Sequence, residues 1–78
     1  QLDQRLAAFL LAEYRRTGSP TVAMTHEQLA QQISSAREAV ARILKQFAED
    51  GLVELKRGAI TILNPAGLES LQQKPLRR

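Results

Sequence analysis

The sequence of 78 residues has no cysteine and no tryptophan, and it holds a single histidine. Without cysteine, neither a disulfide framework nor a thiolate metal site can form. The lone His26 could hold zinc only if several carboxylates converged on it, so we predict no metal site. We also find no nucleophile–base pair, no paired carboxylates and no glycine loop for phosphate. These absences indicate that the chain has no catalytic residues and is not an enzyme.

Long apolar runs are also missing from the sequence, as is a secretory signal. We therefore expect a soluble cytoplasmic domain without a membrane partner. A chain of this length forms one domain, whose modest core hides roughly 60% of the surface of the unfolded chain. The formal net charge of +3 suits an anionic partner but decides little by itself. The chain starts with Gln1 rather than Met, which suggests a processed chain or a piece of a longer protein, and we expect the second.

A helix is predicted from the start of the chain to Arg16 or Thr17. Apolar side chains recur there at three- and four-residue spacing, as on one side of an amphipathic helix: Leu2, Leu6, Phe9, Leu10 and Tyr14. Gly18 suits the position after a helix, because glycine adopts a left-handed backbone without strain. Since this helix uses its apolar side for the core and no long heptad segment is present, we expect the isolated chain to be a monomer.

Two capping boxes predict a pair of helices about three residues apart. Thr25 with Gln28 begins a short helix, and Ser35 with Glu38 begins a longer one that ends near Gly51. Apolar residues continue on one side of each helix: Leu29, Ala30 and Ile33, then Val40, Ile43, Leu44 and Phe47. This pattern is typical of a helix-turn-helix, here over about residues 25–50.

After Gly51 the apolar spacing changes to one that favours strands. Residues 52–55 and 59–63 are rich in leucine and β-branched side chains, and residues 56–58 form a plausible hairpin connection. Asn64 and Pro65 then suit the N-cap and first turn of a short helix over about residues 65–72, with a frayed tail from Gln72 onwards. The predicted fold is mainly α with a small β-hairpin wing over about residues 52–63, a winged helix-turn-helix.

The helix that follows Ser35 carries its charges on one side. When about 100° is allowed per residue, the charged side chains fall between roughly 0° and 140°: Arg37, Glu38, Lys45 and Arg42. The core-facing set falls between roughly 240° and 340° on the same scale: Val40, Ile43, Leu44 and Phe47. The charged side is therefore free to contact a partner.

These charges are chemically suited to read DNA bases. An arginine can donate two hydrogen bonds to guanine O6 and N7, and a carboxylate can accept one from cytosine N4. Arg37 and Glu38 lie in the first turn, the part of a recognition helix that contacts base edges, and Arg42 follows along the groove. Solvated charges are the better interpretation of an isolated amphipathic helix, but the helix before and the hairpin after favour base reading. A winged helix that binds another protein is the alternative, although such a face usually holds apolar anchors.

At these residues the sequence resembles the C-terminal DNA-binding domain of the cyclic-AMP receptor protein/FNR (Crp/Fnr) family of bacterial transcription regulators. The resemblance runs from about Leu6 to Leu63 and is closest in MTHEQLAQQISSAREAVARILKQFAEDGLVELKRGAITIL. Its most specific part is the set Arg37, Glu38 and Arg42 followed by Ile43-Leu44-Lys45. The resemblance implies sequence-specific binding to a double-stranded DNA operator, with a half-site of the TGTGA type.

The resemblance also implies roles for single residues. Arg37, Glu38 and Arg42 match positions that contact base edges. Positions on or near the DNA backbone are matched by Thr25, His26, Lys45 and Lys56. Ala36 stands where the cyclic-AMP receptor branch has a phosphate-contacting serine, so we assign that contact and the helix cap to Ser35. Arg57 joins the backbone set by its charge, although it and Lys56 could equally be solubilising groups of a turn, and His26 an exposed first-turn residue.

Full-length members of this family place an effector domain and a dimerisation helix before this domain, and we expect neither in the chain. The resemblance therefore implies no cofactor in these residues, and it leaves the effector of the parent protein unknown. The parent is expected to be a homodimer. RNA polymerase is a further candidate partner of that parent.

Overall fold

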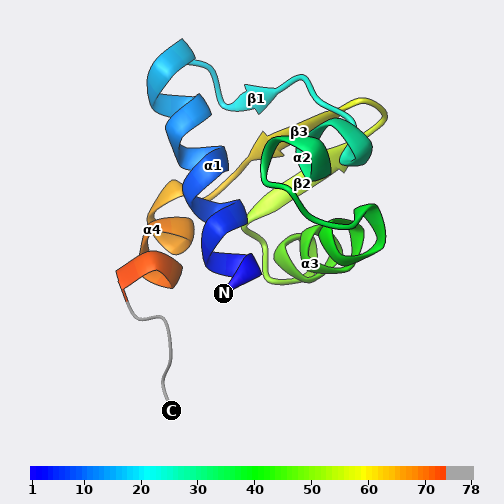
Figure 1. Ribbon diagram of the computed structural model, residues 1–78. Helices are drawn as coiled ribbons and strands as arrows, with labels where there is room; N and C mark the ends of the chain where they lie inside the picture. The colour runs from blue at the N-terminus through cyan, green and yellow to red at the C-terminus, as the bar shows by residue number, and fades with distance from the viewer. Residues whose placement is uncertain (74–78) are drawn as a thin grey trace.

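The computed structural model describes residues 1–73, except for the side chain of Gln73. This part of the chain forms four helices and three strands (Figure 1). In chain order they are α1 (Leu2–Thr17), β1 (Thr21–Val22), α2 (His26–Gln32), α3 (Arg37–Glu49), β2 (Val53–Lys56), β3 (Ala59–Ile62) and α4 (Pro65–Gln73). The predicted winged helix-turn-helix is confirmed.

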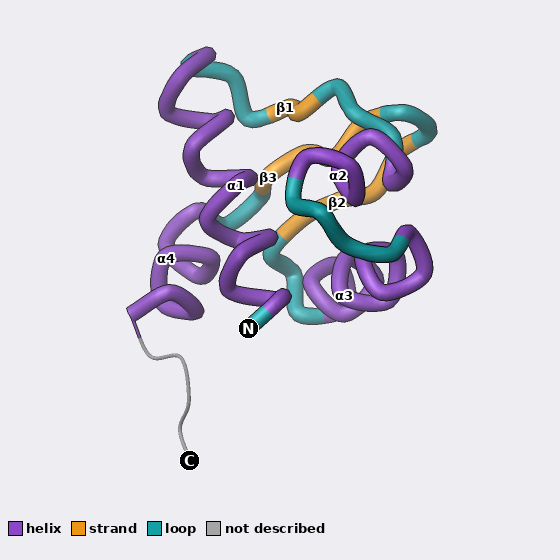
Figure 2. Tube along the Cα trace, in the orientation of Figure 1, coloured by secondary structure: helices purple, strands orange, loops and turns teal. Residues whose placement is uncertain are grey.

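Helix α1 is the long helix predicted at the start of the chain. Leu6 and Leu10 on its apolar side are fully buried. It ends as expected at Gly18, whose φ of 74° is left-handed and whose N–H donates to the carbonyl of Tyr14 at 2.9 Å. Figure 2 shows α1 along one side of the molecule, with α2 and α3 on the other side.

Helix α4 packs against α1 and completes that side of the core. Its Leu68 is fully buried. The predicted N-cap is confirmed, because the side-chain carbonyl of Asn64 accepts from the Gly67 N–H at 3.0 Å. Since α4 continues to Gln73, the prediction of a frayed tail is wrong for Gln72 and Gln73. The rest of that predicted tail, residues 74–78, lies outside the described residues.

The three strands form an antiparallel sheet in the order β1-β3-β2. In the hairpin, Val53 pairs with Ile62 and Lys56 with Ala59, which leaves Arg57 and Gly58 as the turn. The predicted strands are thus confirmed to within one residue at their ends. β1 was not predicted. It consists of two residues that pair with β3, and this pairing gives the hairpin a third strand.

The turn between α2 and α3 confirms one capping box and corrects the other. The Gln28 N–H donates to the Thr25 hydroxyl at 3.1 Å, and the Thr25 N–H donates to the Gln28 side chain at 2.9 Å. The predicted capping box of Ser35 and Glu38 does not form, so that prediction is wrong. Helix α3 has Ala36 as its N-cap, and within residues 1–73 no side chain caps it.

The reason for this correction lies in the backbone of the turn. Ser34 adopts a left-handed φ of 53°, and the Ser35 N–H donates to the carbonyl of Ala30 at 2.9 Å. Ser35 is therefore held in the turn by α2, and α3 begins one residue later than predicted. With Ala36 as N-cap, Glu38 is only the second residue of the helix and is not placed to complete a capping box.

Every side chain that is buried in the described part of the chain is apolar. The core lies between α1, α2, α3, α4 and the sheet, so the charged groups are all at the surface. None of the helices in residues 1–73 combines the length and the apolar character that crossing a membrane would require.

Candidate nucleic-acid interface

The two sides of α3 are separated as the sequence predicts. Val40 and Leu44 are fully buried and Phe47 is 3% exposed, so one side of the helix belongs to the core. The four charged side chains of the predicted outer side are all exposed: Arg37, Glu38, Arg42 and Lys45. The core thus occupies one side of α3, and a partner can reach the other.

A hollow of about 410 Å³, here named the wing hollow, lies where three segments meet. Its walls come from the start of α2, the first residue of α3, the end of β2 and the β2–β3 turn: Thr25, His26, Glu27, Arg37, Lys56, Arg57 and Gly58. The fold thus brings together five predicted site residues that are up to 32 positions apart in the sequence, from Thr25 to Arg57. Four of them were assigned to the DNA backbone and Arg37 to base edges.

The charges around the wing hollow favour an anion. Arg37, Lys56 and Arg57 are positive, whereas Glu27 supplies a single carboxylate. Lys56 reaches Glu54 at 3.9 Å, but both side chains are 56% exposed, and such a pair is weak. Across residues 1–73, neither Arg37 nor Arg57 forms an ion pair. A concave surface with this excess of cations attracts anionic groups.

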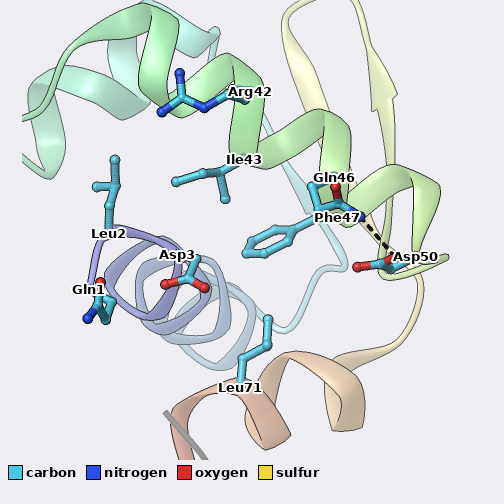
Figure 3. Close-up of a pocket in the computed structure, with 9 residues that line it drawn as sticks. All are labelled: Gln1, Leu2, Asp3, Arg42, Ile43, Gln46, Phe47, Asp50 and Leu71. Carbon is cyan, nitrogen blue, oxygen red and sulfur yellow. Dashed lines mark hydrogen bonds between the residues drawn. The ribbon is translucent and has the colours of Figure 1, made fainter. Parts of the chain in front are cut away.

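Arg42 opens onto a different hollow, of about 510 Å³, here named the α1 hollow. Figure 3 shows Arg42 at one end of it and Leu71 of α4 at the other. The remaining walls come from the start of α1 and from α3: Gln1, Leu2, Asp3, Ile43, Gln46, Phe47 and Asp50. The structure therefore does not bring the two predicted base-reading arginines to one hollow. They share the outer side of α3 but border different neighbours.

The remaining predicted site residues lie outside these two hollows. Glu38 and Lys45 are exposed on the outer side of α3 and line neither one. Ser35 is half-buried in the turn before α3. Because the capping box does not form, the side chain of Glu38 is free to accept a hydrogen bond from a partner.

Sequence reasoning missed two residues that belong to this part of the molecule. Glu27 lines the wing hollow, and its position beside His26 in the sequence could have indicated this. Arg5 of α1 donates a hydrogen bond to the carbonyl of Ile33, the C-cap residue of α2. No sequence pattern links these two positions, because the contact depends on how α1 packs against α2.

The arginines at the other end of α1 are also engaged within the chain. Arg15 forms an ion pair with Glu69 of α4. Arg16 donates to Glu13 at 2.7 Å. This side-chain hydrogen bond lowers the pKa of Glu13 and raises the pKa of Arg16.

Nothing in the described residues is arranged like a metal centre. Residues 1–73 contain no group of three or more histidine, aspartate or glutamate side chains placed to hold a metal ion.

Residues 4–71 match the model of the Crp-like helix-turn-helix domain family. The chain is similar to the transcriptional regulator SdrP of Thermus thermophilus, with 29% identity over an alignment of 79 positions that covers 94% of this chain and 39% of the relative. It is also similar to the cyclic AMP receptor protein of that organism, with 34% identity over 67 positions that cover 86% of this chain and 31% of the relative. The chain thus spans well under half the length of these curated relatives.

Solved structures agree with this match. One is a candidate transcriptional regulator of the Crp/Fnr family from Eubacterium rectale, with a TM-score of 0.89, 45% identity and coverage of 94% of this chain and 34% of that one. Another is a Crp/Fnr-family regulator from Thermus thermophilus, with a TM-score of 0.81, 29% identity and coverage of 94% and 41%. The names of these relatives describe transcriptional regulators and a cyclic AMP receptor protein, and none describes an enzyme.

Proposed function

Because the chain belongs to the Crp-like helix-turn-helix domain family, we propose that it binds double-stranded DNA as the DNA-binding part of a bacterial transcription regulator. The observation that carries this proposal is the outer side of α3, where Arg37, Glu38 and Arg42 are exposed while the core takes the opposite side. A helix of this kind, preceded by a second helix and a tight turn, fits the major groove.

We infer that α3 reads the bases of a half-site of the TGTGA type. Each arginine would donate two hydrogen bonds to a guanine, and Glu38 would accept one from a cytosine. Arg37 and Arg42 are about 140° apart around the helix axis, so they would contact different base pairs. Their exposure supports this assignment, since neither side chain is needed in the core.

The wing hollow supports the proposed contacts to the DNA backbone. Phosphate contacts fix the register of a protein on the duplex, and cations supply most of their attraction. We propose the following residues for these contacts: Thr25, His26, Lys56 and Arg57 at the wing hollow, Lys45 further along α3, and Ser35 in the turn. Ser35 keeps this role through its hydroxyl, without the capping role.

For the parent protein we propose a cytoplasmic homodimer that holds two copies of α3 about 34 Å apart on a palindromic operator. RNA polymerase is proposed as a further partner of that dimer. The residues of this chain are assigned no effector or cofactor. The chain alone is proposed to be a monomer that binds one half-site weakly.

Selection of bound duplexes from a random DNA pool tests the proposed function. We expect enrichment of TGTGA-type half-sites. In a fluorescence anisotropy titration with the selected duplex, log K should fall against log salt with a slope of roughly −3 to −4.5, as expected for three to five neutralised phosphates. A chain that enriches no sequence and binds DNA without salt dependence would contradict DNA binding and favour a winged helix that contacts a protein.

The proposed monomer is tested by fusing a dimerising coiled coil before Gln1. The fusion should raise affinity for a palindrome by orders of magnitude, because the second half-site then binds at high effective concentration. Affinity for a single half-site should barely change. Sedimentation of the unfused chain is the control, and a stable dimer there would reveal a dimer contact within the chain.

A further inference from the structure

His26 is the only histidine of the chain, and it lies in the wing hollow among permanent cations. The side chain is half-buried. The charged groups that line the hollow with it are Glu27 on α2, Arg37 on α3, Lys56 at the end of β2 and Arg57 in the β2–β3 turn. With a neutral imidazole, three cations face one carboxylate, which leaves an excess of two positive charges. Protonation of His26 raises this excess to three.

We propose that His26 is a protonatable phosphate ligand, so that the affinity of the chain for DNA rises as the pH falls. The inference rests on the proposed function, because the phosphate is taken to be a phosphodiester of the DNA backbone. Histidine is the one side chain that ordinarily changes its charge between about pH 5 and 8. Its place in the hollow puts an imidazole ring beside the side chains of Arg37, Lys56 and Arg57.

The physical argument concerns the bound state. A phosphodiester stays negative over this pH range, and a protonated imidazole can donate a hydrogen bond from both of its ring nitrogens. The bound phosphate therefore favours the protonated ring, and DNA binding takes up a proton. Arg37, Lys56 and Arg57 hold the phosphate at any pH in this range. His26 adds its contribution to phosphate binding only when its ring is charged.

The experiment compares three proteins over a range from about pH 8 to pH 5.5. They are the wild-type chain, His26→Arg, which stays positive, and His26→Gln, which stays neutral. Affinity for the selected duplex is measured by fluorescence anisotropy at constant ionic strength. Wild-type affinity should rise about three- to tenfold towards the acidic end, as expected for one additional, partly exposed charge contact. The pH response of both variants should be smaller than that of wild type, and at pH 5.5 His26→Gln should bind more weakly than wild type.

The salt dependence separates a phosphate contact from a structural role. For wild type, the slope of log K against log salt should become steeper by about 0.9 between the alkaline and acidic ends, because one more cation is engaged. The His26→Arg slope should match the steeper value at every pH. Thermal melts of all three proteins at both ends of the range establish that each is folded.

Two results would overturn the inference while leaving the proposed function intact. One is a wild-type pH response equal to that of His26→Gln, and the other is a salt slope that does not change with pH, in proteins that all still select the same duplex. If none of the three proteins selects any DNA sequence, the proposed function fails and the inference fails with it.

A last measurement distinguishes DNA from the free anion as the source of the phosphate. The ring resonances of His26 are followed by NMR during additions of duplex or of inorganic phosphate at the same phosphate concentration. The duplex should shift the His26 resonances at a much lower concentration than inorganic phosphate does, because several contacts hold the duplex at once. An equal response to inorganic phosphate would assign the hollow to a free anion and contradict the DNA contact.

Discussion

Helices α1 and α3 each bury one side and carry arginines on the other, but they use those arginines differently. The arginines of α1 all bond to groups of the same chain: Arg5 to the Ile33 carbonyl, Arg15 to Glu69 and Arg16 to Glu13. In the part of the chain that the structure describes, Arg37 and Arg42 of α3 form no ion pair and donate no side-chain hydrogen bond. The arginines of α1 are thus engaged within the fold, whereas Arg37 and Arg42 of α3 remain available to a partner.

The ion pairs of α1 affect the position of its arginine side chains more than they affect the stability of the fold. An exposed ion pair contributes only about 0 to 1 kcal/mol, so the pairs of Arg15 and Arg16 stabilise the fold little. They nevertheless fix where those guanidinium groups lie. On α3, where no internal partner exists among residues 1–73, the guanidinium donors stay hydrated and available to bases and phosphates. The location of arginines without an internal partner in residues 1–73 is thus what points to α3 as the candidate interface.

The largest expected effect comes from the inner side of α3. Phe47→Ala should lower the free energy of unfolding by about 3 to 5 kcal/mol, because the ring is buried and its loss leaves a cavity. Urea denaturation measures this change, and a domain this small could be largely unfolded by it. Phe9→Ala on α1, where the ring is only half-buried, is the matched control and should cost less. Equal urea midpoints of unfolding for wild type and Phe47→Ala would show that the two sides of α3 are wrongly assigned.

A smaller effect is expected from the outer side. Arg42→Ala should weaken binding to the selected duplex by about 1 to 3 kcal/mol and relax the preference at one base pair. The free energy of unfolding should change by less than about 0.5 kcal/mol. Arg15→Ala, which removes an arginine from α1, should leave the base preference intact. If Arg42→Ala reduced affinity for all sequences alike, Arg42 would be a backbone contact and not a base reader.

Arg5 tests the claim that α1 uses its arginines for the fold. Arg5→Ala should cost about 0.5 to 1.5 kcal/mol of stability, because the Ile33 carbonyl loses its donor at the end of α2. Arg5→Lys should recover part of this loss, since the ammonium group can also donate. The two variants are compared by thermal unfolding. A larger loss of base preference than of stability would instead indicate a direct contact with DNA.

The smallest effect is expected in the turn that joins α2 to α3. Ser34 has a left-handed φ of 53°, a conformation that favours glycine. Ser34→Gly should raise the free energy of unfolding by about 0.5 to 1 kcal/mol, the strain relieved being partly offset by the greater freedom of glycine in the unfolded chain. Ser34→Ala keeps the Cβ atom and serves as the control, with little change expected. A destabilised Ser34→Gly variant would contradict strain at this position.

Most of the fold could be predicted because its signals are local. Apolar spacing located α1 and α3, Gly18 ended the first helix, and Thr25 began α2. Two features were not predicted: β1, which depends on a pairing distant in sequence, and the start of α3, where two local signals compete. β1 has only two residues and forms through its pairing with β3, so it is too short to show a periodic pattern in the sequence. Ser35 and Glu38 have the spacing of a capping box, but the hydrogen bond from Ser35 to Ala30 places the serine before the helix instead.

The candidate site was predicted only in part, because local signals place a side chain on a helix but do not identify its neighbours in the tertiary structure. A helical projection is sufficient to place Arg37 and Arg42 on the outer side of α3, because it needs only the helical period. It cannot show what surrounds each side chain. Arg37 meets the wing and the start of α2, whereas Arg42 lies beside the start of α1, and these neighbours follow from tertiary packing.

The separation of the two sides of α3 has a consequence for how the domain can evolve. Val40, Leu44 and Phe47 restrict one side to large apolar residues, whereas the exposed positions 37, 38, 42 and 45 make no demand on the core. Substitutions at those four positions can therefore accumulate without unfolding the protein. If α3 reads DNA as proposed, exchange of these four side chains would change the bases that it reads and leave the scaffold intact.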